Sequence, residues 1–583
     1  MKKIWALLPV FILIGIMGSV FIPVVAAQDR SSVSSTQLAQ AFLDDLTPEE
    51  RVGQLFLVTF EGSQLSSESE ITDLIINYHI GGVVLQSKND NFSDVAEDIS
   101  QVALLNNSLQ ELAVLGRSSR IESEFEADEV TESTNTEVDT PTDISRGIPI
   151  LIGTTHGGGE NSEILFALTQ SPSQLSVGAT WQPDAAKTVG FVLGDELKEV
   201  GFNLLLNPSL NLASRPEVGG RSESLDLLES FGSNPYWAGR FARKYVEGVQ
   251  EGSNGRIAVI GSHFPGAGGS DRPLNSEIST VLTTLQEMQE GSLLPFMLAA
   301  DSEMMTETID GFMTAHLRYQ GFQGNIDSRS NPISFDGQAL ETLFQIEPLA
   351  GWLSSGGLLV SGELGAEAIQ QFYETADDLF PHRRVAKDAL LAGNDLLYVA
   401  NFAADENDEA DKAENIRDAI EWFTTQYSAD PTFRARVDEA ALKVIQTKLE
   451  LYDGDLSLGN ILVDEVSSSQ NVGLFTEEMR AIARDAATQL SPRPEENPEP
   501  LQGPPNTDNT IVVFTDSRPK QQCSSCDIQF MPDPDGLEER ILSLYGPDAS
   551  NQVNPARIFS FSFEELEAYL DSDLPILVEV SDQ

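Results

Sequence analysis

The sequence predicts an α/β protein whose main part is a (β/α)8 TIM-like barrel, followed by a small and apparently incomplete α/β sandwich domain. Eight short apolar runs recur between residues 44 and 455, and stretches with helical spacing of apolar residues separate most of them. Alternation of this kind over about 400 residues favours a parallel barrel with insertions. The apolar runs cover residues 54–60, 82–85, 148–154, 202–207, 257–261, 311–314, 357–360 and 395–399.

Three of the intervening stretches carry helix signals. Residues 184–200 end at Gly201, a residue type that commonly follows a helix, and residues 235–250 have apolar residues three and four positions apart. Residues 339–353 are predicted to form a third helix. In such a barrel the carboxyl ends of the strands build the functional site.

The length and the net charge of the chain limit the classes of function to be considered. A chain of 583 residues is long enough for several domains, or for one large barrel with an appendage. Its 91 acidic and 35 basic residues give a net charge of −56, which repels nucleic acid and anionic lipid surfaces. Nucleic acid is therefore excluded as the default partner.

The N-terminal residues 1–27 predict export. Lys2 and Lys3 precede an uncharged apolar run from Ile4 to Val25, and small residues stand just before Gln28. This pattern is typical of a cleaved signal peptide, but about 22 apolar residues could also act as an uncleaved signal-anchor. In both cases an extracellular or cell-surface location is expected, with membrane contact only through this segment if it is uncleaved.

Composition shifts divide the remainder into a barrel at 38–455, a connecting segment with a linker at 456–509, and a partial α/β domain at 510–583. Within the barrel, residues 118–146 are strongly acidic and are predicted to form a disordered insertion. Residues 491–509 include six prolines, which favours a semi-rigid linker. The final domain offers only three predicted strands, as if the chain stopped partway through it.

Cys523 and Cys526 are the only cysteines, and they stand in a C-x-x-C pattern. Two thiolates do not complete a structural zinc site, and no histidine lies near them in the sequence. A local disulfide is the expected state in an exported chain. A thioredoxin-like redox role stays open, because the pair follows the apolar run 510–515, although no helix start follows to lower a thiol pKa.

Polar residues stand at the ends of several predicted strands. His263 and His316 end the fifth and sixth strands, where they could line a polar pocket or simply hold the strand ends together. Thr155 begins a segment that continues into three glycines, residues 157–159. The glycines lack the spacing of a P-loop or of a dinucleotide-binding turn, so they indicate a tight turn. We expect no cofactor and no metal.

Several motifs occur together in an order that carries a family resemblance. They are residues 46–56 (LTPEERVGQLF), 230–235 (SFGSNP), 263–266 (HFPG), 293–296 (LLPF) and 313–316 (MTAH). Over roughly residues 44–405 the chain resembles the N-terminal barrel of glycoside hydrolase family 3, most closely its β-N-acetylhexosaminidase branch. The resemblance implies retaining hydrolysis of a β-linked sugar by a carboxylate nucleophile and an acid/base group.

The catalytic positions of that family are altered in this sequence. The nucleophile position is Gly362, and Glu363 stands one residue later, where strand alternation should turn it away from the pocket unless the backbone bulges. The acid/base pair is matched by Pro273 and Asn275. Loss of both groups removes covalent and proton-transfer chemistry together.

Residues that would hold the sugar are altered as well. Thr155 stands where the family has a sugar-binding Asp, and Ser262 stands where it has a Lys. Glu229 stands in the place of a sugar-binding Arg, although Arg221 could be the same group displaced by an insertion. His263 and His316 are retained. The candidate substrate-binding residues are therefore His263, His316, Thr155 and Arg221.

Three functions remain open. The first is a catalytically impaired protein that binds a glycan or cell-wall saccharide. The second is an active retaining β-N-acetylhexosaminidase or β-glucosidase that uses a relocated carboxylate, with Glu363 as the candidate catalytic residue. The third is a purely structural exported domain.

Overall fold

The computed structural model describes residues 35–92, 99–128, 147–159, 162–164, 167–213, 227–267, 270, 275–301, 307–374, 380–404, 409–488 and 505–571. The predicted signal segment at 1–27, Arg221 and Pro273 lie outside these ranges. Among the helices within them, none combines the length and the apolar character needed to cross a membrane.

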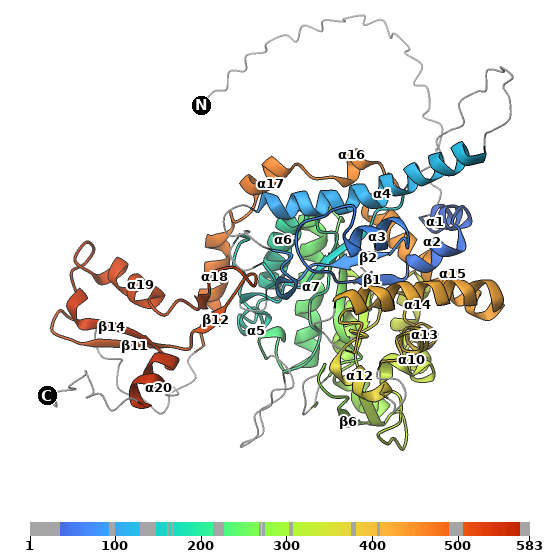
Figure 1. Ribbon diagram of the computed structural model, residues 1–583. Helices are drawn as coiled ribbons and strands as arrows, with labels where there is room; N and C mark the ends of the chain where they lie inside the picture. The colour runs from blue at the N-terminus through green and yellow to red at the C-terminus, as the bar shows by residue number, and fades with distance from the viewer. Residues whose placement is uncertain are drawn as a thin grey trace, which may run out of the picture.

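Eight parallel strands form the barrel, which confirms the predicted fold (Figure 1). Their order is β10-β1-β2-β3-β4-β5-β7-β9. Each strand overlaps one predicted apolar run, and β5 extends past its run to Phe264. The strands are β1 (Phe56–Val58), β2 (Gly82–Val84), β3 (Leu151–Thr154), β4 (Leu204–Leu205), β5 (Ala258–Phe264), β7 (Gly311–Thr314), β9 (Leu358–Val360) and β10 (Leu397–Tyr398).

The strands are short, apolar and almost completely buried, as expected where helices cover one face of a parallel sheet and side chains fill the other. Aromatic rings pack against β5 and β7. Phe264 stacks on Phe344 with ring centroids 4.9 Å apart, and Phe312 lies 4.5 Å from Trp352. This packing fixes the two strands whose ends carry His263 and His316.

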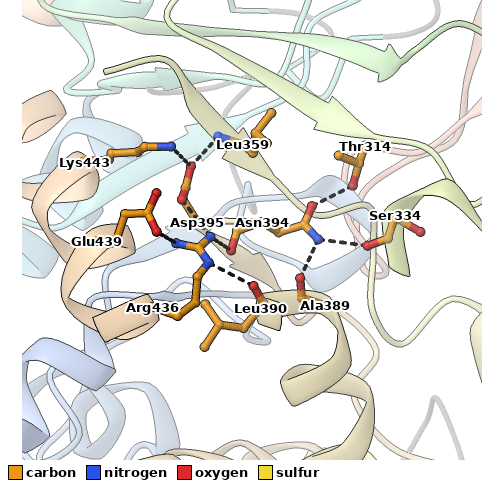
Figure 2. A network of polar contacts seen from close by, with 10 residues as sticks. All are labelled: Thr314, Ser334, Leu359, Ala389, Leu390, Asn394, Asp395, Arg436, Glu439 and Lys443. Atoms are coloured by element: carbon orange, nitrogen blue, oxygen red, sulfur yellow. Dashed lines mark hydrogen bonds and ion pairs between the residues drawn. The ribbon is translucent and has the colours of Figure 1, made fainter. Parts of the chain in front are cut away.

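The junction between β9 and β10 consists of one isolated bridge between Val360 and Leu396, with its backbone hydrogen bonds, and of side-chain contacts. Asp395 is fully buried, and its carboxylate accepts the backbone N–H of Leu359 over 3.0 Å. Figure 2 shows the same carboxylate between Arg436 and Lys443, at 2.8 and 2.9 Å. Side chains thus add to the backbone bonds at this junction, as Asn203 does where its oxygen accepts the N–H of Ile152 in β3.

The helices begin and end largely where the sequence indicates. Helix α6 (Pro183–Glu199) and helix α7 (Pro235–Ser253) match two predicted helices and pack side by side through glycines. A β-carbon added at Gly190 would lie 2.2 Å from the carbonyl oxygen of Tyr245, so only glycine allows this approach. At the start of α2 (Pro48–Gly53), Thr47 and Glu50 form a capping box.

One helix prediction is corrected. Residues 339–353 do not form one helix but two, α10 (Gly337–Leu343) and α11 (Leu349–Ser354). Pro348 lies between them, and proline cannot continue a helix because it lacks an N–H and clashes with the preceding turn. Helix α4 (Ser100–Asp128) includes the first part of the acidic insertion, whose Glu and Ala residues are good helix formers. Residues 129–146 lie outside the described residues.

The other helices of the barrel region lie around it (Figure 1). They are α1 (Ser35–Asp44), α3 (Glu70–Ile76), α5 (Gln174–Ala179), α8 (Leu285–Glu290), α9 (Leu294–Ala300), α12 (Glu367–Tyr373), α13 (His382–Ala392), α14 (Glu409–Ala429) and α15 (Pro431–Leu451). A separate parallel pair, β6 (Thr280–Thr283) and β8 (Arg318–Gly321), lies outside the barrel sheet.

The connecting segment packs on the barrel through three helices, α16 (Leu458–Ile461), α17 (Glu465–Asn471) and α18 (Thr476–Ala486). The buried carboxylate of Glu196 accepts hydrogen bonds from Thr169 and from the backbone N–H of Gly473. Burial raises the pKa of this carboxyl. Most of the predicted proline-rich linker lies outside the described residues.

The C-terminal module lies to one side of the barrel, beyond α18 (Figure 1). Strands β11 (Ile511–Thr515) and β14 (Ile558–Ser562) pair in parallel, and β12 (Arg518–Lys520) pairs antiparallel with β13 (Gln529–Met531). Helices α19 (Gly536–Tyr545) and α20 (Phe563–Asp571) accompany them. Cys523 and Cys526 are joined by a disulfide. The last of the three strands predicted for this domain, at residues 575–580, lies outside the described residues.

Candidate functional site

The ends of β5 and β7 bring two histidines to the carboxyl end of the barrel. His263 precedes Phe264, which pairs with Thr314 of the neighbouring strand, and His316 follows two residues after Thr314. Burial, and to a smaller extent the nearby His263, lowers the pKa of His316. The structure therefore brings these two predicted site residues together.

Hydrogen bonds set the protonation of His263. The side-chain amide of Asn211 donates to His263 Nδ1 over 3.0 Å, and its oxygen accepts the backbone N–H of Ala267 over 2.9 Å. Nδ1 is therefore an acceptor, which leaves the proton of the neutral ring on Nε2. Burial lowers the pKa of His263 to about 4, so the ring is neutral at physiological pH.

His316 has both ring nitrogens engaged. Its Nε2 lies 2.9 Å from the carbonyl oxygen of Glu363, which can only accept, so Nε2 carries the proton. Its Nδ1 accepts from the hydroxyl of Ser334 over 2.8 Å. Burial lowers the pKa of His316 to about 4. A histidine held in this way ties the ends of β7 and β9 together and cannot exchange a proton without breaking one of these bonds.

The same ring closes the position where the sequence comparison places a nucleophile. A β-carbon added at Gly362 would lie 2.7 Å from His316 Nε2 and 2.8 Å from the carbonyl oxygen of Thr314. No side chain larger than hydrogen fits there unless His316 moves. The family resemblance assigns a carboxylate to this position, and this chain has a glycine there.

Glu363 turns its carboxylate toward the end of β10, where the side-chain amide of Asn401 donates to it. Tyr398 is buried beside this group, and its hydroxyl accepts a hydrogen bond from Gln86 over 3.3 Å. The pKa of Tyr398 is raised by burial and further by the charges of Glu363 and Glu163. Glu363 accepts the hydrogen bond from His316 with its backbone oxygen.

Glu163 is a site residue that sequence reasoning missed. Its carboxylate accepts the backbone N–H and the hydroxyl of Ser87, at 2.6 and 2.7 Å, and the hydroxyl of Thr155 at 3.3 Å. A carboxylate from the loop after β3 thus reaches Thr155, the position at which an acid was expected and found missing. The only sequence signal is an acid shortly after the glycine turn.

The remaining predicted positions contribute less. Asn275 uses its backbone carbonyl to accept the N–H of Ala368 over 2.9 Å. Arg221 and Pro273 lie outside the described residues. Asn211, Ser334 and Asn401 were not selected from the sequence as site residues, because amides and hydroxyls after strands are too common to stand out.

Residues 47–422 match the family model described as the glycosyl hydrolase family 3 N terminal domain. The chain belongs to glycosyl hydrolase family 3. A relative, the beta-hexosaminidase of Nitrosomonas eutropha, is 25% identical over 297 residues, which cover 50% of this chain and 73% of the relative.

Solved structures agree with the barrel assignment. A family 3 beta-N-acetylglucosaminidase from a Paenibacillus species has a TM-score of 0.58 at 22% identity, over 80% of this chain and 72% of that one. A beta-glucoside phosphorylase gives a TM-score of 0.60 at 14% identity, over 92% of this chain and 78% of that one. At these identities the likeness establishes the fold.

Within this family 3 barrel the described site residues suit hydrogen bonding to hydroxyl groups. The N–H of His263 Nε2 can donate, and the carboxylates of Glu163 and Glu363 can accept. Retaining hydrolysis also needs two carboxyl groups about 5 Å apart on either side of the anomeric carbon. The resemblance assigns one of them to position 362, where a β-carbon would lie 2.7 Å from His316 Nε2.

Proposed function

We propose that this family 3 protein is an exported protein that binds a β-linked glucosaminide or glucoside at its barrel mouth without hydrolysing it. The proposal rests above all on His316, whose Nε2 lies 2.7 Å from where the β-carbon of a side chain at position 362 would stand. The substrate class is suggested by the relatives named beta-hexosaminidase.

The retained groups support binding rather than chemistry. The neutral ring of His263 keeps an N–H that is not used in its bond to Asn211. His316 is fully engaged by Ser334 and by the backbone of Glu363, so it acts on the shape of the mouth. Sugar binding requires a polar concave surface, whereas hydrolysis requires placed acid and base groups that this mouth lacks at position 362.

The experiment pairs binding with turnover on the purified protein. We expect N-acetylglucosamine oligomers to bind in isothermal titration calorimetry, and His263→Ala to weaken binding about tenfold through loss of one hydrogen-bond donor. His382→Ala is the matched control, because His382 lies on α13 and pairs with Asp418 instead. Aryl β-N-acetylglucosaminides and β-glucosides should show no turnover.

Gly362→Asp sharpens the test. We expect it to restore no activity, because the new side chain collides with His316 and the acid/base positions are still altered. Turnover by the native protein that disappears in Glu363→Gln would overturn the proposal in favour of a relocated nucleophile. Absence of binding across a glycan panel would favour a purely structural role.

Export is part of the same proposal and has its own test. Lys2, Lys3 and the apolar run that follows them support it. Fractionation should place the protein outside the cytoplasm, and N-terminal sequencing should show a start at Gln28 if the signal is cleaved. Recovery of the full-length chain in the cytoplasmic fraction would contradict export.

A further inference from the structure

The disulfide loop of the C-terminal module, residues 521–526, is braced from within and buried on one side. Gln521 donates its side-chain amide to the carbonyl oxygens of Ser524 and Cys526, at 3.2 and 2.8 Å. Gln522 and Cys523 are each only 3% exposed, whereas most of the other described residues of this module are exposed or half-buried. Such burial requires a partner surface.

That partner surface is the rim of the barrel mouth. The backbone N–H and the hydroxyl of Ser524 both donate to the carboxylate of Asp90, each over 2.6 Å. Gln522 donates its amide to the backbone oxygen of Glu163 over 2.6 Å. Asp90 follows β2 and Glu163 follows β3, so the loop bridges two neighbouring strand ends.

These two rim segments are already linked to each other. Glu163 accepts both the N–H and the hydroxyl of Ser87, and the N–H of Asp90 bonds to the carbonyl of Ser87 over 3.0 Å. The disulfide loop therefore contacts the same small network that brings the Glu163 carboxylate to Thr155. Between the loop and Thr155 at the mouth stand two hydrogen bonds, from Gln522 to the backbone oxygen of Glu163 and from Thr155 to its carboxylate.

We propose that the Cys523–Cys526 loop is a redox-sensitive latch, which docks the C-terminal module on the rim of the barrel mouth when oxidised and releases it when a dithiol reduces the pair. The disulfide closes the turn that presents Gln522 and Ser524 to their partners on the barrel. Without the crosslink, the same contacts must be made by an unconstrained chain, and ordering that chain costs entropy.

The reduction follows ordinary thiol–disulfide exchange through a mixed disulfide with the dithiol. The hydroxyl of Ser525 lies 3.4 Å from Cys523 Sγ and can donate a hydrogen bond to the thiolate of Cys523 until solvent protonates it. The second thiol of the reductant then displaces the remaining protein sulfur, which leaves two protein thiols and an oxidised dithiol.

Amide hydrogen exchange of the full-length protein tests the latch without any glycan, so its outcome is separate from the binding proposal. With dithiothreitol we expect the amides of residues 87–91 to exchange about tenfold faster, because a pair of hydrogen bonds to a charged group is lost. The variant Cys523→Ser/Cys526→Ser should exchange at the faster rate and should not respond to dithiothreitol.

Ser524→Ala provides a second test, since it keeps the disulfide and removes one hydrogen bond to Asp90. We expect it to speed exchange at residues 87–91 while the protein stays oxidised, and this readout holds even if the double cysteine variant fails to fold. Unchanged exchange at residues 87–91 after complete reduction, or in Ser524→Ala, would overturn the latch.

Discussion

Lys448 carries an amine on the buried face of α15, and the variant Lys448→Met tests its effect on stability. The side chain is 1% exposed, and Nζ donates to Oε1 of Gln54 over 2.6 Å. Burial lowers the pKa of Lys448 from 10.5 to about 7. We predict that Lys448→Met weakens the dependence of the unfolding free energy on pH above neutrality.

The sign follows from proton counting. Between pH 7 and pH 10.5 the unfolded chain holds a proton on Lys448 that the folded chain has lost, so the unfolding free energy rises with pH in this window. The pKa difference, 10.5 − 7, corresponds to about 5 kcal/mol in all. About 2 kcal/mol of it falls between pH 7 and pH 9. Methionine cannot titrate and lacks this contribution.

Urea unfolding followed by tryptophan fluorescence at pH 7, 8 and 9 measures the difference. The native protein should gain about 2 kcal/mol more than Lys448→Met across this range. Loss of the donor to Gln54 shifts the variant equally at every pH, so the slope is the readout. Lys88→Met, at an exposed position, should keep the native slope. Equal slopes for the native protein and Lys448→Met would refute a neutral buried amine.

Three further variants test the fold by thermal or urea unfolding. Asp395→Asn should destabilise the barrel by about 3–5 kcal/mol, because it leaves the cations of Arg436 and Lys443 without their buried partner; a change below 1 kcal/mol would contradict this. In the native protein the unfolding free energy should fall as the pH rises from 3.8 to 7, because burial raises the pKa of Asp310 to about 7 and penalises its charged form. Asp310→Asn should abolish this fall. Thr47→Ala should cost about 1 kcal/mol through loss of the helix cap, and Ser66→Ala, at an exposed site, should cost little.

The barrel could be predicted because its signal is spread over many residues. Each strand is a short apolar run, and an error of one or two residues at either end leaves the order of elements unchanged. The prediction of one helix at 339–353 was wrong for a local reason, because Pro348 interrupts an apolar pattern that is otherwise continuous. Local breaks of this kind can be recognised in a sequence once proline is given its full weight.

The site could be predicted only in part. His263 and His316 stand directly at strand ends, so their proximity follows from topology. The contact between Glu163 and Thr155 depends on the path of the loop after the glycine turn, which apolar periodicity does not describe. The collision at Gly362 depends on the rotamer of His316, which Ser334 fixes from 18 residues away. Such distances in sequence leave no local pattern.

The barrel has a seam where β9 meets β10. Backbone bonds join the two strands there, from the N–H of Leu396 to the oxygen of Leu359 and from the N–H of Ser361 to the oxygen of Leu396. Side chains add two more: the Asp395 carboxylate accepts one N–H of β9, and the hydroxyl of Ser361 accepts the N–H of Tyr398 over 2.9 Å. Ser361 directly precedes Gly362, so the hydrogen bond from Tyr398 to the Ser361 hydroxyl also holds the backbone on which Gly362 stands. The junction that completes the barrel thus also fixes the strand end at its mouth.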